Sequence, residues 1–82
     1  MKLGIYSLKN VLYQGEAKSV NLKTQAGEIT VLDHHKPLIS MIAPGVITIE
    51  DEEGTTREIS AAGGFLEVRD NNEARLLIDE LQ

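Results

Sequence analysis

The sequence contains no cysteine and no tryptophan, and its only aromatic residues are two tyrosines and one phenylalanine. Without cysteine, the chain forms neither a disulfide framework nor a zinc ribbon, and it has no thiol nucleophile. Three aromatic rings, Tyr6, Tyr13 and Phe65, offer little surface on which a sugar stacks. These absences disfavour a disulfide-stapled domain, a thiol enzyme and a carbohydrate-binding module.

Positive charge and long apolar runs are scarce as well. Eight Lys and Arg residues stand against 13 Asp and Glu, which gives a formal charge of −5 and disfavours sustained contact with nucleic-acid phosphates. No apolar run reaches the roughly 18–20 residues that a membrane-spanning helix needs. We therefore expect one small soluble domain over residues 1–82, with any link to a membrane made through a partner protein.

What the sequence does contain is alternation with a period of two, which is typical of half-buried β-strands. Residues 46–50 place Ile47 and Ile49 on one face, and residues 65–69 do the same with Leu66 and Val68. In residues 18–23 the alternation groups Lys18 with Val20 and Leu22.

Turn signals separate these runs at short intervals, which favours an all-β sandwich or barrel. They are Gln14-Gly15, Ala26-Gly27, Pro44-Gly45, Asp51 to Gly54, Gly63-Gly64 and Asp70 to Asn72. The acidic run from Asp51 to Gly54 is typical of a solvated hairpin tip. The pair Gly63-Gly64 indicates a bulge or a point where a side chain would collide with a neighbouring strand.

The last segment, "NNEARLLIDELQ", is ambiguous on pattern alone. Ala74, Leu77, Ile78 and Leu81 have helical spacing behind Asn72 as a possible N-cap, whereas strand geometry would place Ala74, Leu76 and Ile78 on one face.

Asp33-His34-His35 is the one cluster that resembles a metal or catalytic site. Neighbouring strand residues point to opposite faces, so the two imidazoles bind one ion only if a loop bends them together. The sequence has no further His or Cys to complete a zinc site, and no serine lies in a nucleophile elbow. We favour loop histidines that are exposed or hydrogen-bonded to backbone, and expect no catalytic residue, metal or cofactor.

Three blocks of the chain resemble the N-terminal β-sandwich domain of the epsilon subunit of rotary F-type ATP synthase, called delta in mitochondria. They are "LGIYSLKNVLYQGEAKSV" from Leu3, "GEITVLDHHKPLISMIAPGVITI" from Gly27 and "SAAGGFLEV" from Ser60. They occur in the family's order and cover nearly the whole chain. Four positions depart from the family pattern: Thr30 replaces Gly, Asp33-His34 replaces Pro-Gly, Lys36 replaces a small residue and Ala43 replaces Lys.

The resemblance implies a two-sheet β-sandwich of about ten short, mostly antiparallel strands, without the family's usual C-terminal helical hairpin. It also implies that Glu73 to Ile78 form a strand, with the last residues left open. The implied role is that of a non-catalytic rotor subunit, a peripheral protein at the cytoplasmic face of a bacterial membrane, which couples the gamma subunit to the c-ring.

The family's contact residues carry over position by position. Glu28 and His35 match positions that meet the c-ring, and Ser7 and Ser40 match positions close to gamma. Two alternatives stay open: a stand-alone sandwich that binds another ligand, and a small metal-dependent β enzyme built around Asp33, His34 and His35.

Overall fold

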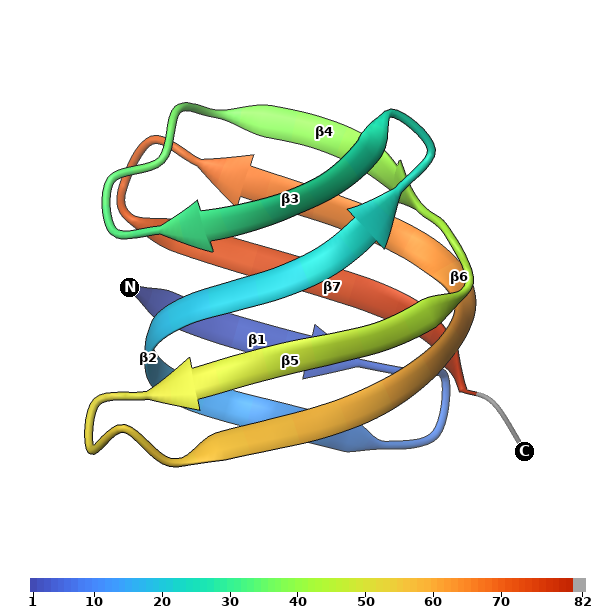
Figure 1. The fold of residues 1–82 in the computed structure, drawn as a ribbon, viewed down its shortest axis with the longest axis horizontal. Helices are drawn as coiled ribbons and strands as arrows, with labels where there is room; N and C mark the ends of the chain where they lie inside the picture. The colour runs from blue at the N-terminus through green and yellow to red at the C-terminus, as the bar shows by residue number, and fades with distance from the viewer. Residues whose placement is uncertain (81–82) are drawn as a thin grey trace.

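The computed structural model describes residues 1–80, which form seven β-strands and no helix (Figure 1). The strands are β1 Lys2–Tyr6, β2 Val11–Thr24, β3 Gly27–Leu32, β4 Leu38–Ile42, β5 Gly45–Asp51, β6 Thr56–Arg69 and β7 Glu73–Glu80. This confirms the all-β fold. There are seven strands where about ten were expected, because β2 and β6 each run unbroken for 14 residues.

The strands form two layers that β2 and β6 join at their bends. We call the layer of β3, the second half of β2, β5 and the first half of β6 the front layer, after its place in Figure 1. The rear layer contains the first half of β2, β1, β7, the second half of β6, and β4. All pairings are antiparallel except that of β1 with β7.

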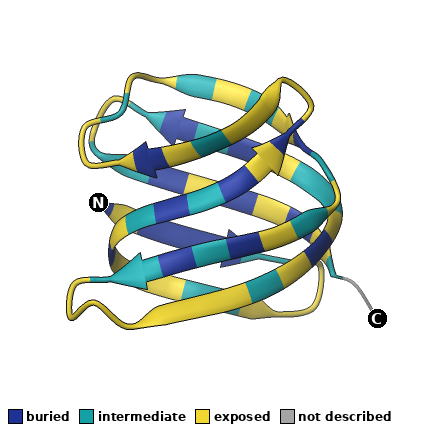
Figure 2. Ribbon diagram, in the orientation of Figure 1, coloured by how far each residue is buried: buried dark blue, intermediate teal, exposed yellow. Residues whose placement is uncertain are grey.

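The core lies between the layers and is made of the inward-facing residues of each strand (Figure 2). Ile47, Ile49, Leu66 and Val68 are all buried, as their alternation predicted. In β7, Ala74, Leu76 and Ile78 are buried while Leu77 is exposed, so the ambiguous segment is a strand and the helical alternative is wrong. The predicted helical position Leu81 lies outside the described residues.

Two details of β2 differ from the sequence-based expectation. Lys18 is exposed and does not share a face with Val20 and Leu22, because a bulge between Ala17 and Ser19 shifts the register against β5. Gln14-Gly15 is not a turn: the strand continues through Gly15, which pairs with Leu3. The turns at 25–26, 51–54 and 70–72 are confirmed, and the Asp51 carboxylate accepts hydrogen bonds from the N–H groups of Glu53 and Thr55 at the exposed hairpin tip.

The Gly63-Gly64 pair lies inside β6, where it forms the predicted bulge and close approach. The register between β6 and β7 shifts between Ala61 and Gly63. A Cβ atom on Gly64 would lie 2.8 Å from the Cα of Ile78 and closer still to the carbonyl oxygen of Leu77. The glycine therefore lets β7 pack against β6 at the bend between the layers.

Candidate docking site

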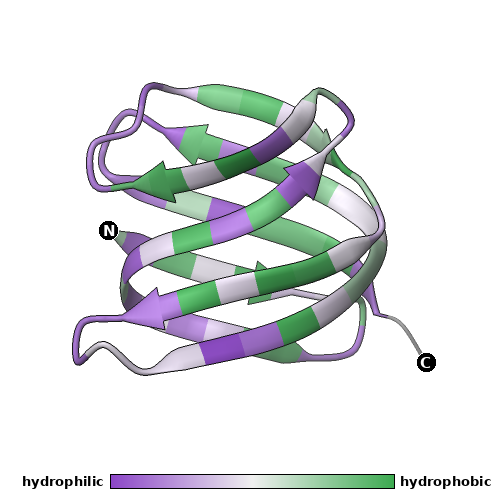
Figure 3. Ribbon diagram, viewed as in Figure 1, coloured by the Kyte–Doolittle hydropathy of each residue, from purple (hydrophilic) through white to green (hydrophobic). Residues whose placement is uncertain are grey.

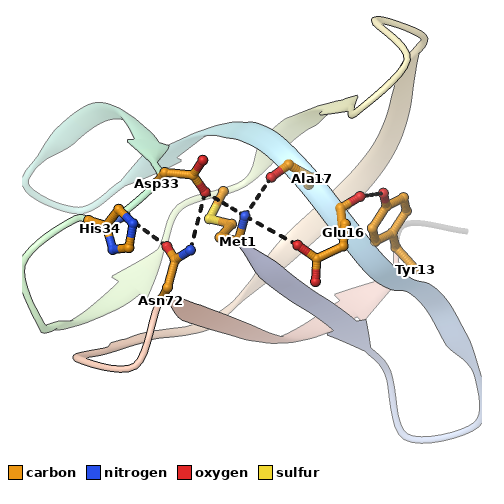
Figure 4. A network of polar contacts seen from close by, with 7 residues as sticks. All are labelled: Met1, Tyr13, Glu16, Ala17, Asp33, His34 and Asn72. Carbon is orange, nitrogen blue, oxygen red and sulfur yellow. Dashed lines mark hydrogen bonds and ion pairs between the residues drawn. The ribbon is translucent and has the colours of Figure 1, made fainter.

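The loop that contains Asp33 and His34 is tied to the N-terminus and to the turn between β6 and β7 (Figure 4). The Met1 ammonium donates hydrogen bonds to the Asp33 carboxylate and, at 2.9 Å, to the carbonyl of Ala17. The Asn72 amide donates to the same Asp33 oxygen at 3.4 Å. Asp33 is thus a structural anchor of the loop.

His34 takes a backbone conformation that is uncommon for a residue with a side chain. Its φ is +61°, in the left-handed region, and its N–H donates a 2.7 Å hydrogen bond to the side-chain oxygen of Asn72. The family glycine that this histidine replaces would reach that region without steric cost. The contact with the Asn72 side chain therefore helps to hold His34 in this conformation.

The Met1–Asp33 pair shifts both of its titrating groups. The hydrogen bonds from the Met1 ammonium and Asn72 lower the pKa of Asp33 below its ordinary value of 3.8. Burial by itself would lower the pKa of the Met1 ammonium, but the hydrogen bond and charge of Asp33 outweigh burial, so this pKa is raised from 8.0. Asp33 is more than half exposed, so solvent screens much of the attraction.

The two histidines make different contacts. His34 contributes its backbone N–H to the loop, whereas the Nδ1 atom of His35 lies 2.8 Å from the carbonyl oxygen of Lys36. Among residues 1–80, no three His, Asp or Glu side chains gather as a metal site would require. The geometry thus favours the loop interpretation over the metal-site interpretation of this cluster.

Glu28 and His35 lie beyond opposite ends of one strand. Glu28 is exposed near the start of β3 and pairs with Lys23, whereas His35 follows the end of β3. Four steps of about 3.3 Å separate Glu28 from the end of β3 at Leu32, roughly 13 Å, and the His35 N–H bonds back to the Leu32 carbonyl. The structure thus does not bring them together in one loop.

Ser7 and Ser40 lie in different parts of the rear layer, and Ser40 pairs with the buried Leu66 and so does not lie on the outer face. Ser7 follows β1 in a tight turn, where its hydroxyl accepts a 3.2 Å hydrogen bond from the N–H of Asn10. Ser40 lies on the edge strand β4 and is half-buried. Ser7 is thus a turn residue.

The outer face of the rear layer carries a continuous row of apolar side chains. Met41 pairs with Phe65, Phe65 pairs with Leu77, and Leu77 pairs with Tyr6, so the row crosses four strands. Met41, Phe65 and Leu77 are 49%, 41% and 59% exposed. We call Tyr6, Met41, Phe65 and Leu77 the apolar row; three of them line a pocket of about 380 Å³, bordered by Glu67 and Arg75.

Charged residues flank one side of the apolar row. Arg69 lies 3.4 Å from the carboxylate of Glu67, and Glu73 is within 4 Å of both Arg69 and Arg75. These exposed pairs add little stability individually. They give the outer face of the rear layer an apolar part and a charged part.

The outer face of the front layer is more polar, although Leu32 and Val46 are exposed there. Thr30, Asn21, Thr48 and Glu58 lie in one cross-strand register, and the Asn21 amide donates a 2.8 Å hydrogen bond to the Thr30 hydroxyl. The hydropathy in Figure 3 shows apolar residues alternating with polar ones along the front strands, whereas β4 at the rear is largely green. The two outer faces thus differ in chemistry, and the apolar one is suited to bind another protein.

Sequence patterns predicted single positions of this site but not the apolar row that they form together. Alternation placed Phe65 outside, but nothing in the sequence revealed that Phe65, Leu77 and Tyr6 share one cross-strand row. That row depends on the register of β6, β7 and β1, which long-range pairing sets.

A β-sandwich with an apolar outer face is typical of a small protein-docking domain. The family model for the ATP synthase delta/epsilon chain β-sandwich domain matches residues 1–81. The chain belongs to this family.

A curated relative, ATP synthase epsilon chain 2 of Burkholderia orbicola (strain AU 1054), is 44% identical over 69 residues, which cover 83% of this chain and 45% of the relative. The chain thus spans about half the length of the relative that it matches.

No helix that could cross a membrane occurs in residues 1–80.

Two solved structures share the fold. A chain in the cryo-EM structure of Euglena gracilis mitochondrial ATP synthase, OSCP/F1/c-ring, has a TM-score of 0.89 at 24% identity, with 95% of this chain and 49% of that chain covered. A chain in the Tetrahymena thermophila mitochondrial ATP synthase central stalk/c-ring structure has a TM-score of 0.82 at 13% identity, with 98% and 63% covered. At these identities the likeness establishes the fold alone.

Proposed function

We propose that this domain is a non-catalytic rotor element of an F-type ATP synthase, which fastens the gamma subunit to the c-ring during ion-driven ATP synthesis. It acts at the cytoplasmic face of a bacterial membrane, as a peripheral part of the complex. Membership of the delta/epsilon family supports this role, as do the central-stalk and c-ring assemblies that contain the structural neighbours. The single domain over residues 1–82 needs no cofactor for it.

The observation that carries the proposal is the apolar row. A stably folded sandwich buries its large apolar side chains between its layers, yet Met41, Phe65 and Leu77 are each about half exposed on one outer face. An exposed apolar patch of this kind, bordered by charge, marks a protein interface. We assign this face to the gamma subunit, together with Ser7 and Ser40, which adjoin Tyr6 and Met41 in the chain.

The c-ring contact belongs to the ends of β3 in this proposal. Glu28, beside the turn at residues 25–26, is exposed and carries a negative charge that suits a polar loop of a ring subunit. His35, at the other end of the strand, makes a second and separate contact. The distance between them means that each residue has to be tested alone.

The test is binding of the 82-residue chain to the gamma subunit. Phe65→Glu combined with Leu77→Glu introduces two charges into the apolar row, and we expect Kd to rise at least about thirtyfold, the effect of losing roughly 2 kcal/mol at an interface centre. The two new carboxylates would lie opposite each other on β6 and β7, which costs up to about 1 kcal/mol, so circular dichroism first checks that the variant is folded at the assay temperature.

The matched control is Ser60→Glu, which adds a charge to an exposed outward position of β6 in the front layer. Its affinity should equal that of the wild type. If the double variant binds gamma as tightly as the control, the assignment of this face is wrong. If the wild-type chain does not bind gamma at all, the stalk role is wrong and a stand-alone binding module becomes the better hypothesis.

A further inference from the structure

Among residues 1–80, the strand β4 has one edge that is almost unpaired. It pairs with β6 over its whole length, Leu38–Ile42, while its other edge meets β2 in a single residue pair, Thr24 with Ile42. Near that pair, the Met41 carbonyl accepts a 3.1 Å hydrogen bond from the N–H of Gln25, on the side away from β6.

That hydrogen bond identifies which backbone groups face the open edge. In an antiparallel pair, the N–H and C=O groups of successive residues point to alternate edges of the strand. Since the Met41 carbonyl points away from β6, so do the Met41 N–H and both backbone groups of Ile39. Three main-chain groups of β4 are therefore available to a further strand.

The edge strand β4 is short, at five residues, but within the strand it lacks the charge, proline and bulges that protect many free edges. Natural edge strands are blunted by charged residues, proline or bulges, because a bare edge pairs with other chains. Residues 38–42 read "LISMI", without charge or proline, and Ile39 and Met41 are 65% and 49% exposed. By comparison, the edge strand β3 carries Glu28.

The free edge is continuous with the proposed gamma-binding face, because Met41 is the first residue of the apolar row. A partner that covers the row reaches the edge of β4 at its margin. A second copy of this chain is a weaker candidate, since each copy has a formal charge of −5 and two copies repel each other.

We propose that β4 accepts an extended segment of the gamma subunit as an added strand, with main-chain hydrogen bonds to Ile39 and Met41. This inference rests on the proposed function. The segment that fits is uncharged and apolar, because it lies beside Ile39 and Met41 and continues the rear layer. Main-chain pairing supplies affinity in such a complex, and the flanking side chains supply selectivity.

A pair of substitutions at one position separates main-chain pairing from side-chain contact. Ile39→Ala removes the side chain and keeps the N–H, whereas Ile39→Pro also removes the N–H on the open edge. Proline is tolerated there, because the Ile39 N–H does not bond to β6. We expect the proline variant to bind gamma about tenfold more weakly than the alanine variant, the effect of one lost hydrogen bond plus the clash of the ring. Equal affinities would overturn the inference.

Amide hydrogen exchange on the wild-type chain gives a second readout, which needs no variant. The Ile39 and Met41 amides should exchange rapidly in the isolated chain and slowly in the complex with gamma. Binding without this protection would overturn strand addition alone and leave the stalk role intact. Absence of binding would overturn both, and protection that grows with the concentration of the isolated chain would assign the edge to a second copy.

Discussion

The glycine at position 64 gives the sharpest test of how the two layers are joined. Three glycines in the strands, Gly15, Gly63 and Gly64, have nearly the same φ, between +147° and +152°, where residues with a Cβ are strained. They differ in what a Cβ would meet: nothing within 4 Å at Gly15, an ordinary 3.6 Å contact with the Ile42 carbonyl at Gly63, and the backbone of β7 at Gly64. Alanine at each position therefore separates backbone strain from steric exclusion.

The magnitudes follow from these contacts. Each alanine costs about 1–3 kcal/mol for the unfavourable φ. At Gly64 the Cβ would also push β7 away from β6, which adds about 1–3 kcal/mol, as overpacking does. An 82-residue domain has a total stability of only about 4–12 kcal/mol. We expect Gly64→Ala to melt roughly 10 °C below Gly15→Ala, taking about 2 kcal/mol of extra destabilisation and about 5 °C for each.

The assay is thermal and urea unfolding of the three alanine variants, followed by circular dichroism. Gly63→Ala should behave like Gly15→Ala, since its Cβ has room. If Gly64→Ala is no less stable than Gly15→Ala, the close approach of β7 is not the reason for the glycine, and the packing argument at this bend is wrong.

Three further predictions concern the loop that contains Asp33 and His34, and Glu28 near the start of β3. His34→Gly removes the left-handed strain and keeps the N–H bond to Asn72, so the free energy of unfolding should rise by up to about 1 kcal/mol in urea titrations, and a large loss would refute the strain argument. The pKa of Asp33 is lowered and that of the Met1 ammonium is raised, so the pair stabilises the fold fully between their ordinary values of 3.8 and 8.0. Its contribution to stability is lost as pH falls through the pKa of folded Asp33, and also as pH rises through the pKa of the folded ammonium. The melting difference between wild type and Asp33→Asn should therefore be largest within that window, and a difference independent of pH would contradict the ion pair. Glu28→Lys should weaken retention by a purified c-ring while Lys18→Glu, a charge reversal at an exposed bulge residue, should not; equal retention would remove Glu28 from the ring contact.

Local sequence patterns predicted most of the strands, because the alternation of apolar and polar residues follows directly from one face of a strand being buried. Ile47 with Ile49 and Leu66 with Val68 are buried as expected. The errors have physical causes. The pattern predicts a turn at Gly15, but a glycine inside a strand also marks a bend. The bulge that exposes Lys18 has no signature in the sequence.

The docking site was less predictable than the fold. The role of Asp33 depends on Met1 and Asn72, which lie 32 and 39 residues away, so no local pattern reports it. The family resemblance supplied Ser7 and Ser40, which adjoin Tyr6 and Met41 in the chain, although Ser40 pairs with the buried Leu66 and does not face outward. The separation of Glu28 from His35 became visible only when the length of β3 was known.

Thiol labelling in the assembled synthase tests the central claim most directly, because the chain has no cysteine of its own. Leu77→Cys places a thiol in the apolar row, and Ser60→Cys places one on the opposite outer face. Both thiols should react with a maleimide in the isolated chain, as the mass of the chain records. In the complex, we predict that the thiol at position 77 is protected while the thiol at position 60 still reacts. Equal labelling of the two positions in the complex would contradict the account.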